Sequence, residues 1–189
     1  MFKLRKIITG LILSLALFPI QLKAVDFTWT EGHYDLPLPG YPGINILNIY
    51  NDVTVTILDN GGSFVNQFNM YDDSSLTMFK GNSIGTLNLY ENSTASLFGG
   101  NIYYLWVDST STGLVKLYAQ DVFFMPSSGP TDPGSVMGYW ISNNQPFHIG
   151  FTGDSLQGEI TRSFIQIVPE PATLVLVALG CLAIFRRRK

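Results

Sequence analysis

Cysteine is almost absent from this sequence. Its 189 residues include one cysteine, Cys181, which lies in an apolar stretch near the C-terminus. The preceding body therefore has no thiols with which to form a disulfide or a cysteine-ligated zinc site. If the body folds outside the cytoplasm, packing and hydrogen bonds alone must stabilise it.

Basic residues are scarce between the two ends of the chain. Between residues 24 and 171, only Lys80, Lys116 and Arg162 are basic, whereas all 14 acidic residues lie in this stretch. Such an acidic body repels the phosphates of nucleic acid. No nucleic-acid-binding motif is present either, so nucleic acid is excluded as a partner.

Catalytic motifs are also missing. The sequence has no nucleophile elbow, no phosphate-binding loop and no zinc motif. His33 and His148 lie far apart in the sequence, and neither has a second histidine or a cysteine at metal-ligand spacing. We therefore predict that the protein is not an enzyme and has no catalytic residue, metal site or obligatory cofactor.

What the sequence does contain is a repeat of about 20 residues between positions 44 and 121. Three copies carry the pattern Leu-Asn-Ile-Tyr, Phe-Asn-Met-Tyr and Leu-Asn-Leu-Tyr, ending at Tyr50, Tyr71 and Tyr90, and a looser fourth copy runs from Leu105 to Tyr118. Apolar and polar residues alternate within each copy, as in strands with one buried face. We predict an all-β fold, a right-handed β-solenoid of about four coils. A β-sandwich of hairpins is the alternative.

The segments on either side are predicted to cap the solenoid, because a stack of coils leaves apolar ends. Residues 25–43 end in a run rich in proline and glycine, which favours an extended N-terminal cap. A second such run at 125–134 predicts a loop within a small antiparallel β cap formed by residues 122–167. The strands expected in this C-terminal cap are 136–141, 147–151 and 160–167.

Polar residues at one bend of the repeat are expected to stack in rows. The first row would contain Asn51, Asp72, Glu91 and Asp108, and the second would contain Asp52, Asp73 and Asn92. Stacked carboxylates repel unless a cation separates them, and calcium prefers oxygen ligands. One interpretation is therefore a calcium or glycan corner, although the glycine-rich calcium signature of β-rolls is absent. The plainer interpretation is solvated turn residues. The candidate ligands are Asp52, Asp72, Asp73, Glu91 and Asp108.

Two further patterns suggest binding surfaces. Hydroxyl residues recur opposite the buried positions, as Thr54-x-Thr56, Ser75-x-Thr77 and Thr94-x-Ser96. Such rows resemble ice-binding surfaces and would suit polysaccharide, but threonine and serine are also ordinary outward residues of strands. The repeated tyrosines could form an exposed aromatic face for sugar rings or an inward ladder that stiffens a corner. Tyr103, Tyr104 and Trp106 would extend that face.

The N-terminus has the features of a secretory signal peptide. Residues 1–24 begin with a basic run, continue through an apolar core from Ile7 to Leu17 and end at the small residue Ala24. This order predicts export and cleavage after Ala24. An uncleaved anchor is the alternative, but the apolar run is short for a helix that spans a bilayer.

The C-terminus, residues 168–189, combines three features in order: Pro169-Glu170-Pro171, an apolar run from Leu174 to Phe185, and the cluster Arg186-Arg187-Arg188-Lys189. This arrangement resembles the PEP-CTERM sorting signal of Gram-negative bacteria. The resemblance implies a transmembrane helix that anchors the chain in the inner membrane until an exosortase removes the tail. It covers about the last 22 residues and implies nothing about the body. A plain membrane anchor after a proline linker is the alternative. The residues expected to carry sorting are Pro169, Glu170, Pro171, Arg186, Arg187 and Arg188.

Together these features predict an exported, non-catalytic protein of the cell surface or extracellular matrix. Its expected partners are the secretion machinery, an exosortase, the inner membrane and an exopolysaccharide. The first alternative is a carbohydrate-binding or carbohydrate-active β-helix protein. An ice-binding or adhesive face is the second.

Overall fold

The computed structural model of the chain describes residues 25–36, 43–58 and 64–169. The predicted signal peptide and the predicted anchor helix lie outside these residues. Within the described ranges, no helix is both long enough and apolar enough to cross a membrane. The described residues form two β-sheets and a short helix.

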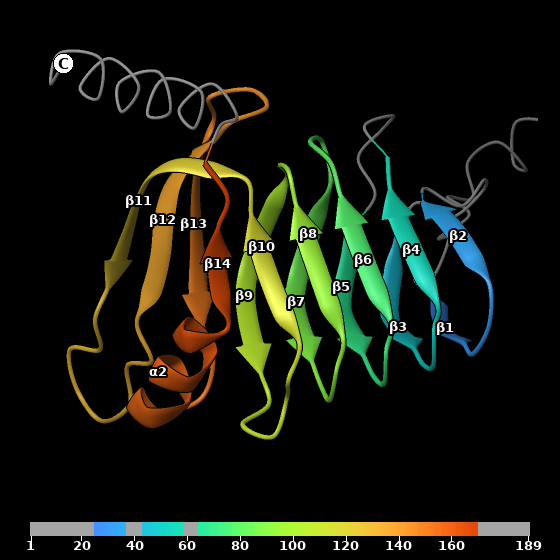
Figure 1. Ribbon diagram of the computed structural model, residues 1–189, viewed down its shortest axis with the longest axis horizontal. Helices are drawn as coiled ribbons and strands as arrows, with labels where there is room; N and C mark the ends of the chain where they lie inside the picture. The colour runs from blue at the N-terminus through green and yellow to red at the C-terminus, as the bar shows by residue number, and fades with distance from the viewer. Residues whose placement is uncertain (1–24, 37–42, 59–63, 170–189) are drawn as a thin grey trace, which may run out of the picture.

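The four repeats form the coils of a two-sided β-solenoid, in which each coil gives one strand to a long sheet and the next strand to a short sheet (Figure 1). Successive strands are parallel in both sheets. This arrangement confirms the predicted solenoid, because a sandwich of hairpins would pair its strands in antiparallel fashion. The coils are β3 (Ile44–Ile49) with β4 (Thr54–Ile57), β5 (Phe64–Met70) with β6 (Ser75–Met78), β7 (Ser83–Leu89) with β8 (Thr94–Leu97), and β9 (Asn101–Val107) with β10 (Leu114–Leu117).

The core lies between the two sheets, and equivalent residues of successive repeats are direct partners there. On the long sheet, Leu47 pairs with Phe68, Phe68 with Leu87, and Leu87 with Leu105. On the short sheet, one buried row consists of Val55, Leu76, Ala95 and Val115. All of these side chains are at most 1% exposed. Removal of this apolar surface from water drives the stacking of the coils.

The segment predicted as the N-terminal cap adds one strand to each sheet. Strand β1 (Val25–Trp29) pairs with β3, and β2 (His33–Leu36) pairs with β4, both in parallel. Three partly buried aromatic side chains, Phe27, Trp29 and Tyr34, pack against the core. The rings of Trp29 and Tyr34 stack across the two sheets with centroids 4.0 Å apart. These rings therefore cover the apolar end of the stack.

Beyond the fourth coil, the long sheet continues through an antiparallel meander. Strands β11 (Ala119–Met125), β12 (Ser135–Trp140) and β13 (Pro146–Phe151) pair in antiparallel order, and β13 joins the meander to β9 in parallel. The strands expected at 136–141 and 147–151 correspond to β12 and β13. Strand β11 crosses the predicted boundary at residue 121, where Asp121 has a φ of 49° and the pairing register shifts.

The strand predicted at 160–167 is wrong for most of its length. Residues Ser155–Ser163 form helix α2, and only Ile165–Ile167 form a strand, β14, which pairs in parallel with β10. The Oδ1 atom of Asp154 caps the helix by accepting a hydrogen bond from the backbone N–H of Gln157 at 2.9 Å. The apolar residues Phe164, Ile165 and Ile167 resemble a strand, but the polar residues Thr161, Arg162 and Ser163 before them belong to the helix.

Helix α2 completes hydrogen bonds of β9 beyond the point at which β13 ends. The carbonyl of Val107 accepts a hydrogen bond from Nε2 of Gln157 at 2.6 Å, and the N–H of Val107 donates to the hydroxyl of Thr161 at 3.4 Å. Gly158 lies against the backbone of Pro133, so close that a Cβ atom there would meet its carbonyl oxygen at 1.8 Å. The helix is therefore held firmly against the end of the solenoid.

Candidate functional site: surfaces of the solenoid

The polar corners of three coils share a left-handed backbone conformation. Asn51, Asp72 and Glu91 have φ angles of 56°, 54° and 56°. Asparagine and aspartate tolerate this conformation better than most residues, whereas glutamate adopts it less readily. The fourth corner, at Asp108, is longer and does not share this backbone angle.

Three corner carboxylates accept hydrogen bonds from neighbouring coils. Oδ2 of Asp72 accepts a hydrogen bond from the N–H of Asn51 at 2.9 Å, and Oε2 of Glu91 accepts one from the N–H of Asp72 at 2.6 Å. In the second row, Oδ1 of Asp73 accepts a hydrogen bond from the side-chain amide of Asn92 at 3.1 Å. These carboxylates therefore satisfy polar groups at the bend and link the coils.

Calcium at these corners stays a prediction. The ion usually takes about six to eight oxygen ligands. In both rows, carboxylates already accept hydrogen bonds from backbone or side-chain amide groups. Among the residues that the structure describes, no group of three or more histidine, cysteine, aspartate or glutamate side chains is placed to hold a metal ion. The hydrogen bonds between coils give Asp72, Asp73 and Glu91 a structural role.

A ladder of asparagines crosses the outer surface of the long sheet. Nδ2 of Asn69 donates to Oδ1 of Asn48, and Nδ2 of Asn88 donates to Oδ1 of Asn69, both at 2.7 Å. Asn69 and Asn88 are only 6% and 9% exposed, although they point away from the core. The sequence analysis did not predict this ladder. Its signal was the asparagine that lies two positions before each repeated tyrosine.

The predicted hydroxyl rows lie on the outer surface of the short sheet. We call this surface the hydroxyl face. Two rows of register partners carry its hydroxyls, and a third row of stacked aromatic rings lies beside them. The Oγ atom of Ser75 donates to the hydroxyl of Thr54 at 3.1 Å, so neighbouring hydroxyls within a row interact. The rows are Thr54, Ser75 and Thr94; Thr56, Thr77 and Ser96; and the aromatic residues Phe79, Phe98 and Tyr118.

The repeated tyrosines form a ladder rather than an open platform for sugars. The rings of Tyr50 and Tyr71 stack with centroids 4.5 Å apart and an interplanar angle of 5°, and those of Tyr71 and Tyr90 at 4.6 Å and 9°. Each ring therefore covers the face of the next. Burial, and then the neighbouring rings of Tyr90 and Tyr50, raise the pKa of Tyr71 to about 12. Tyr103 and Tyr104 lie outside this stack and are 55% and 51% exposed.

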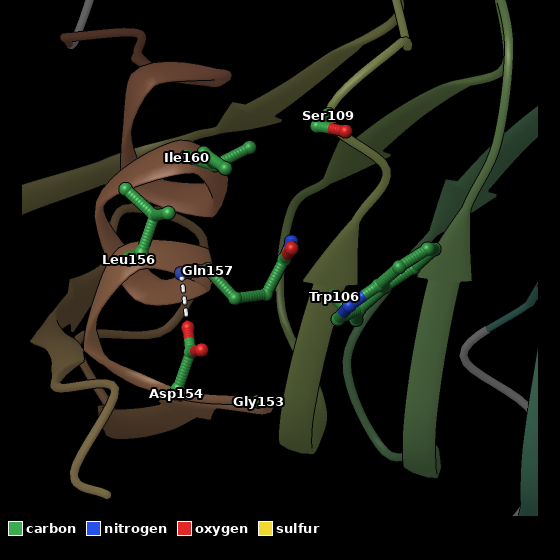
Figure 2. Close-up of a pocket in the computed structure, with 7 residues that line it drawn as sticks. All are labelled: Trp106, Ser109, Gly153, Asp154, Leu156, Gln157 and Ile160. Atoms are coloured by element: carbon green, nitrogen blue, oxygen red, sulfur yellow. Dashed lines mark hydrogen bonds between the residues drawn. The ribbon is translucent and has the colours of Figure 1, made fainter. Parts of the chain in front are cut away.

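Trp106 ends the tyrosine ladder at a tilt. Its ring centroid lies 4.9 Å from that of Tyr90, but the ring planes meet at 53°. The indole lines an open hollow of about 410 Å³ between β9 and α2 (Figure 2). The other residues that line the hollow are Ser109, Gly153, Asp154, Leu156, Gln157 and Ile160.

The two histidines lie in different environments and do not meet. His33 contacts the carboxylate of Asp35 at 3.2 Å on strand β2, and both side chains are exposed. Nε2 of His148 lies 2.9 Å from Oγ of Ser135, across strands β12 and β13. This serine–histidine pair is the nearest approach to a nucleophile and base in the described chain. No acidic side chain of the described residues hydrogen-bonds to the His148 ring to orient it, as a triad requires.

Sorting information lies at the C-terminal end. Residues 168–189 match the model of the PEP-CTERM protein-sorting motif. The chain carries a PEP-CTERM sorting motif. No curated protein and no solved structure matches the chain. The motif supports an exported protein that is anchored at its C-terminus before an exosortase processes it. Of the predicted sorting residues, Pro169 ends the described chain, whereas Glu170, Pro171 and the arginine cluster lie outside it.

Proposed function

We propose that the body is a non-catalytic module of the cell surface or matrix that associates with exopolysaccharide after export. The PEP-CTERM sorting motif at residues 168–189 is the observation that carries this proposal. A protein with this motif is placed outside the inner membrane, where it can meet the polysaccharide of an extracellular matrix. The solenoid body then supplies long, flat outer surfaces on which an extended polymer can lie.

The hydroxyl face is the surface best suited to a polysaccharide. Its two hydroxyl rows repeat once per coil, at the strand spacing of about 4.8 Å, and the rows lie about 6.6 Å apart along each strand. Hydroxyl groups both donate and accept hydrogen bonds, so they match the hydroxyls of a sugar chain. The stacked rings of Phe79, Phe98 and Tyr118 beside these rows add apolar surface. Among the described residues, charged side chains in the hydroxyl rows lie at the row ends, at Asp35 and Lys116.

We propose a passive role rather than catalysis, because the corner carboxylates are engaged in hydrogen bonds that link the coils. Ser135 and His148 approach each other, but they lie on the outer surface of the meander rather than among the residues that line the hollow. Glycoside hydrolysis generally needs two carboxylates on either side of the bond that is cleaved. The corner carboxylates are instead bonded to the neighbouring coils.

Cosedimentation tests this function. The full-length chain, purified in mild detergent, is mixed with bacterial cellulose as a neutral polymer and alginate as an acidic one, with and without calcium. We expect calcium-independent binding to cellulose that weakens several-fold in Thr56→Glu/Thr77→Glu, which places charge on the hydroxyl face. The matched control, Tyr103→Glu, places one charge on the long sheet and should bind like the wild type.

Each outcome of this experiment has a clear meaning. Binding to alginate only with calcium would assign recognition to the acidic corners rather than to the hydroxyl face. Absence of binding to either polymer in both conditions would refute the association of the body with exopolysaccharide.

A further inference from the structure

The hollow between β9 and α2 has the composition of a small-molecule site. It measures about 410 Å³, within the range of roughly 300–1,000 Å³ that is usual for ligand pockets. An aromatic ring forms one wall, aliphatic side chains of α2 form another, and a few polar groups lie between them (Figure 2). We propose that this hollow binds one pyranose residue of a polysaccharide that bears no negative charge.

Trp106 provides the surface on which a sugar ring would stack. The preceding rings of the ladder are parallel to within 9° and cover one another, whereas Trp106 is turned by 53° and borders the hollow. The face of an aromatic ring carries negative charge density, and the C–H groups on one side of a pyranose carry positive charge density. Leu156, which is 69% exposed, and Ile160 complete the apolar boundary.

The polar groups of the hollow are held in place and are mainly acceptors. Oδ1 of Asp154 caps α2, which leaves Oδ2 without a hydrogen-bond partner among the described residues. Nε2 of Gln157 donates to the carbonyl of Val107 at 2.6 Å, which fixes the amide and leaves its Oε1 atom as an acceptor. Ser109 adds a hydroxyl. Fixed acceptors suit the several hydroxyl donors of a sugar and require little reorganisation on binding.

The charge of the hollow selects against acidic sugars. No lysine or arginine is among the described residues that line it, and the carboxylate of Asp154 already occupies the N-terminal end of the helix. A uronate or a sulfated sugar would therefore meet a like charge without a compensating cation. Neutral and amino-bearing pyranoses meet no such repulsion.

This proposal rests on the proposed function for its biological context, because the same polymer would contact the solenoid at two places. It names a separate site, however, and can fail by itself. The hydroxyl face lies on the short sheet, whereas the hollow lies at the fourth coil beside α2. Variants of the two surfaces can therefore be compared.

Tryptophan fluorescence of the full-length chain in mild detergent tests the site. The probes are cellotetraose, the β-1,4-linked glucosamine tetramer and tetragalacturonate. We expect a saturable change with at least one of the first two and none with tetragalacturonate. Trp106→Ala removes the indole that reports binding, so this variant is measured by isothermal titration calorimetry beside the wild type, and its affinity should fall by about tenfold or more. Tyr103→Ala removes a more exposed aromatic side chain from the same strand and should leave binding unchanged.

A second variant keeps the test decisive if Trp106→Ala alters the fold. Asp154→Asn retains a good helix cap, because asparagine and aspartate cap equally well, but it removes the charge. We expect this variant to lose the discrimination against tetragalacturonate. No response to the first two probes, equal binding of all three by the wild type, or unchanged selectivity in Asp154→Asn would overturn the proposal.

The two proposals can be separated by cosedimentation with cellulose. If the wild type and Trp106→Ala sediment equally, and neither cellotetraose nor the glucosamine tetramer produces a fluorescence change in the wild type, the hollow is not a sugar site but the proposed function stands. If cellotetraose binds at Trp106 while the wild type does not sediment, the hollow is a sugar site and the matrix role fails.

Discussion

The asparagine ladder makes a sharp prediction about stability. In Asn69→Val, the side chain retains a shape suited to a strand but loses its three hydrogen bonds. These are the bonds to Asn48 and Asn88 at 2.7 Å and to Nε2 of Gln67 at 3.1 Å. Each bond contributes about 0.5–1.5 kcal/mol net, and a buried group left without a partner costs about 1–3 kcal/mol. The variant should therefore lose about 2–4 kcal/mol.

Part of this cost depends on which neighbour is left unpaired. Asn88 is 9% exposed, so water cannot readily replace Asn69 as the acceptor for its amide. Asn48 is only half-buried and can recover a hydrogen bond from solvent. For a chain of this size, a loss of about 2–4 kcal/mol corresponds to a fall of roughly 5–15 °C in the melting temperature. Thermal unfolding followed by circular dichroism measures it.

Asn66→Val is the matched control, because it makes the same substitution on the same strand. Asn66 is exposed, and its amide donates a single bond of 3.3 Å to Asn45. An exposed substitution of this kind should cost about 0.5 kcal/mol or less. If Asn69→Val were no less stable than Asn66→Val, the ladder would not stabilise the stack and the reasoning would be refuted.

Three further predictions concern the bends of the coils. The pKa of Tyr71 is about 12 in the folded protein and 10.0 in the unfolded reference, so the unfolded state loses its proton first. The stability of the fold should therefore decrease as pH rises from 10 to 12. Tyr71→Phe should show a smaller decrease and lack the tyrosinate absorbance step at the highest pH. Aspartate tolerates the φ of 56° at position 91 better than glutamate and keeps a hydrogen-bond acceptor, so the melting temperature of Glu91→Asp should equal or exceed that of the wild type. Glu91→Val should lose about 2 kcal/mol or more of stability. Equal stability of Glu91→Asp and Glu91→Val would contradict the role of this backbone angle. The hydroxyl of Ser74 is buried without a partner, whereas that of Ser93 donates to a backbone carbonyl at 2.8 Å. Ser74→Val, which introduces the residue found at Val53 in the first repeat, should therefore stabilise the fold by about 1 kcal/mol, and Ser93→Val should destabilise it. The reverse order of stability in urea unfolding would contradict this reasoning.

The solenoid was predictable because its signal repeats. Identical residue types at a spacing of about 20 residues, such as Tyr50 and Tyr71, become register partners when the coils stack, and the alternation of apolar residues identifies the buried face. The hydroxyl rows followed from the same alternation. The N-terminal segment was predicted as a cap, but its aromatic rings, including Trp29 and Tyr34, cannot be placed without knowing that β1 and β2 extend both sheets.

The last third of the body was less predictable because it does not repeat. Helix α2 is only nine residues long, and the apolar residues Phe164, Ile165 and Ile167 directly after it favour a strand. Its position depends on contacts with distant backbone, such as that of Gly158 with Pro133 and that of Gln157 with Val107. The hollow beside Trp106 arises from this docking, so no local pattern could have revealed it.

The PEP-CTERM motif at residues 168–189 predicts processing by an exosortase. The most direct test expresses the full-length chain in a Gram-negative host that contains an exosortase and in the same host without it, and measures cellular fraction and intact mass. We predict that the wild type leaves the inner membrane without residues of its C-terminal tail only when the exosortase is present. The Pro169→Ala/Glu170→Ala/Pro171→Ala variant should stay in the membrane at the unprocessed mass. A full-length chain in the cytoplasm, or the same processed mass with and without the exosortase, would contradict the account.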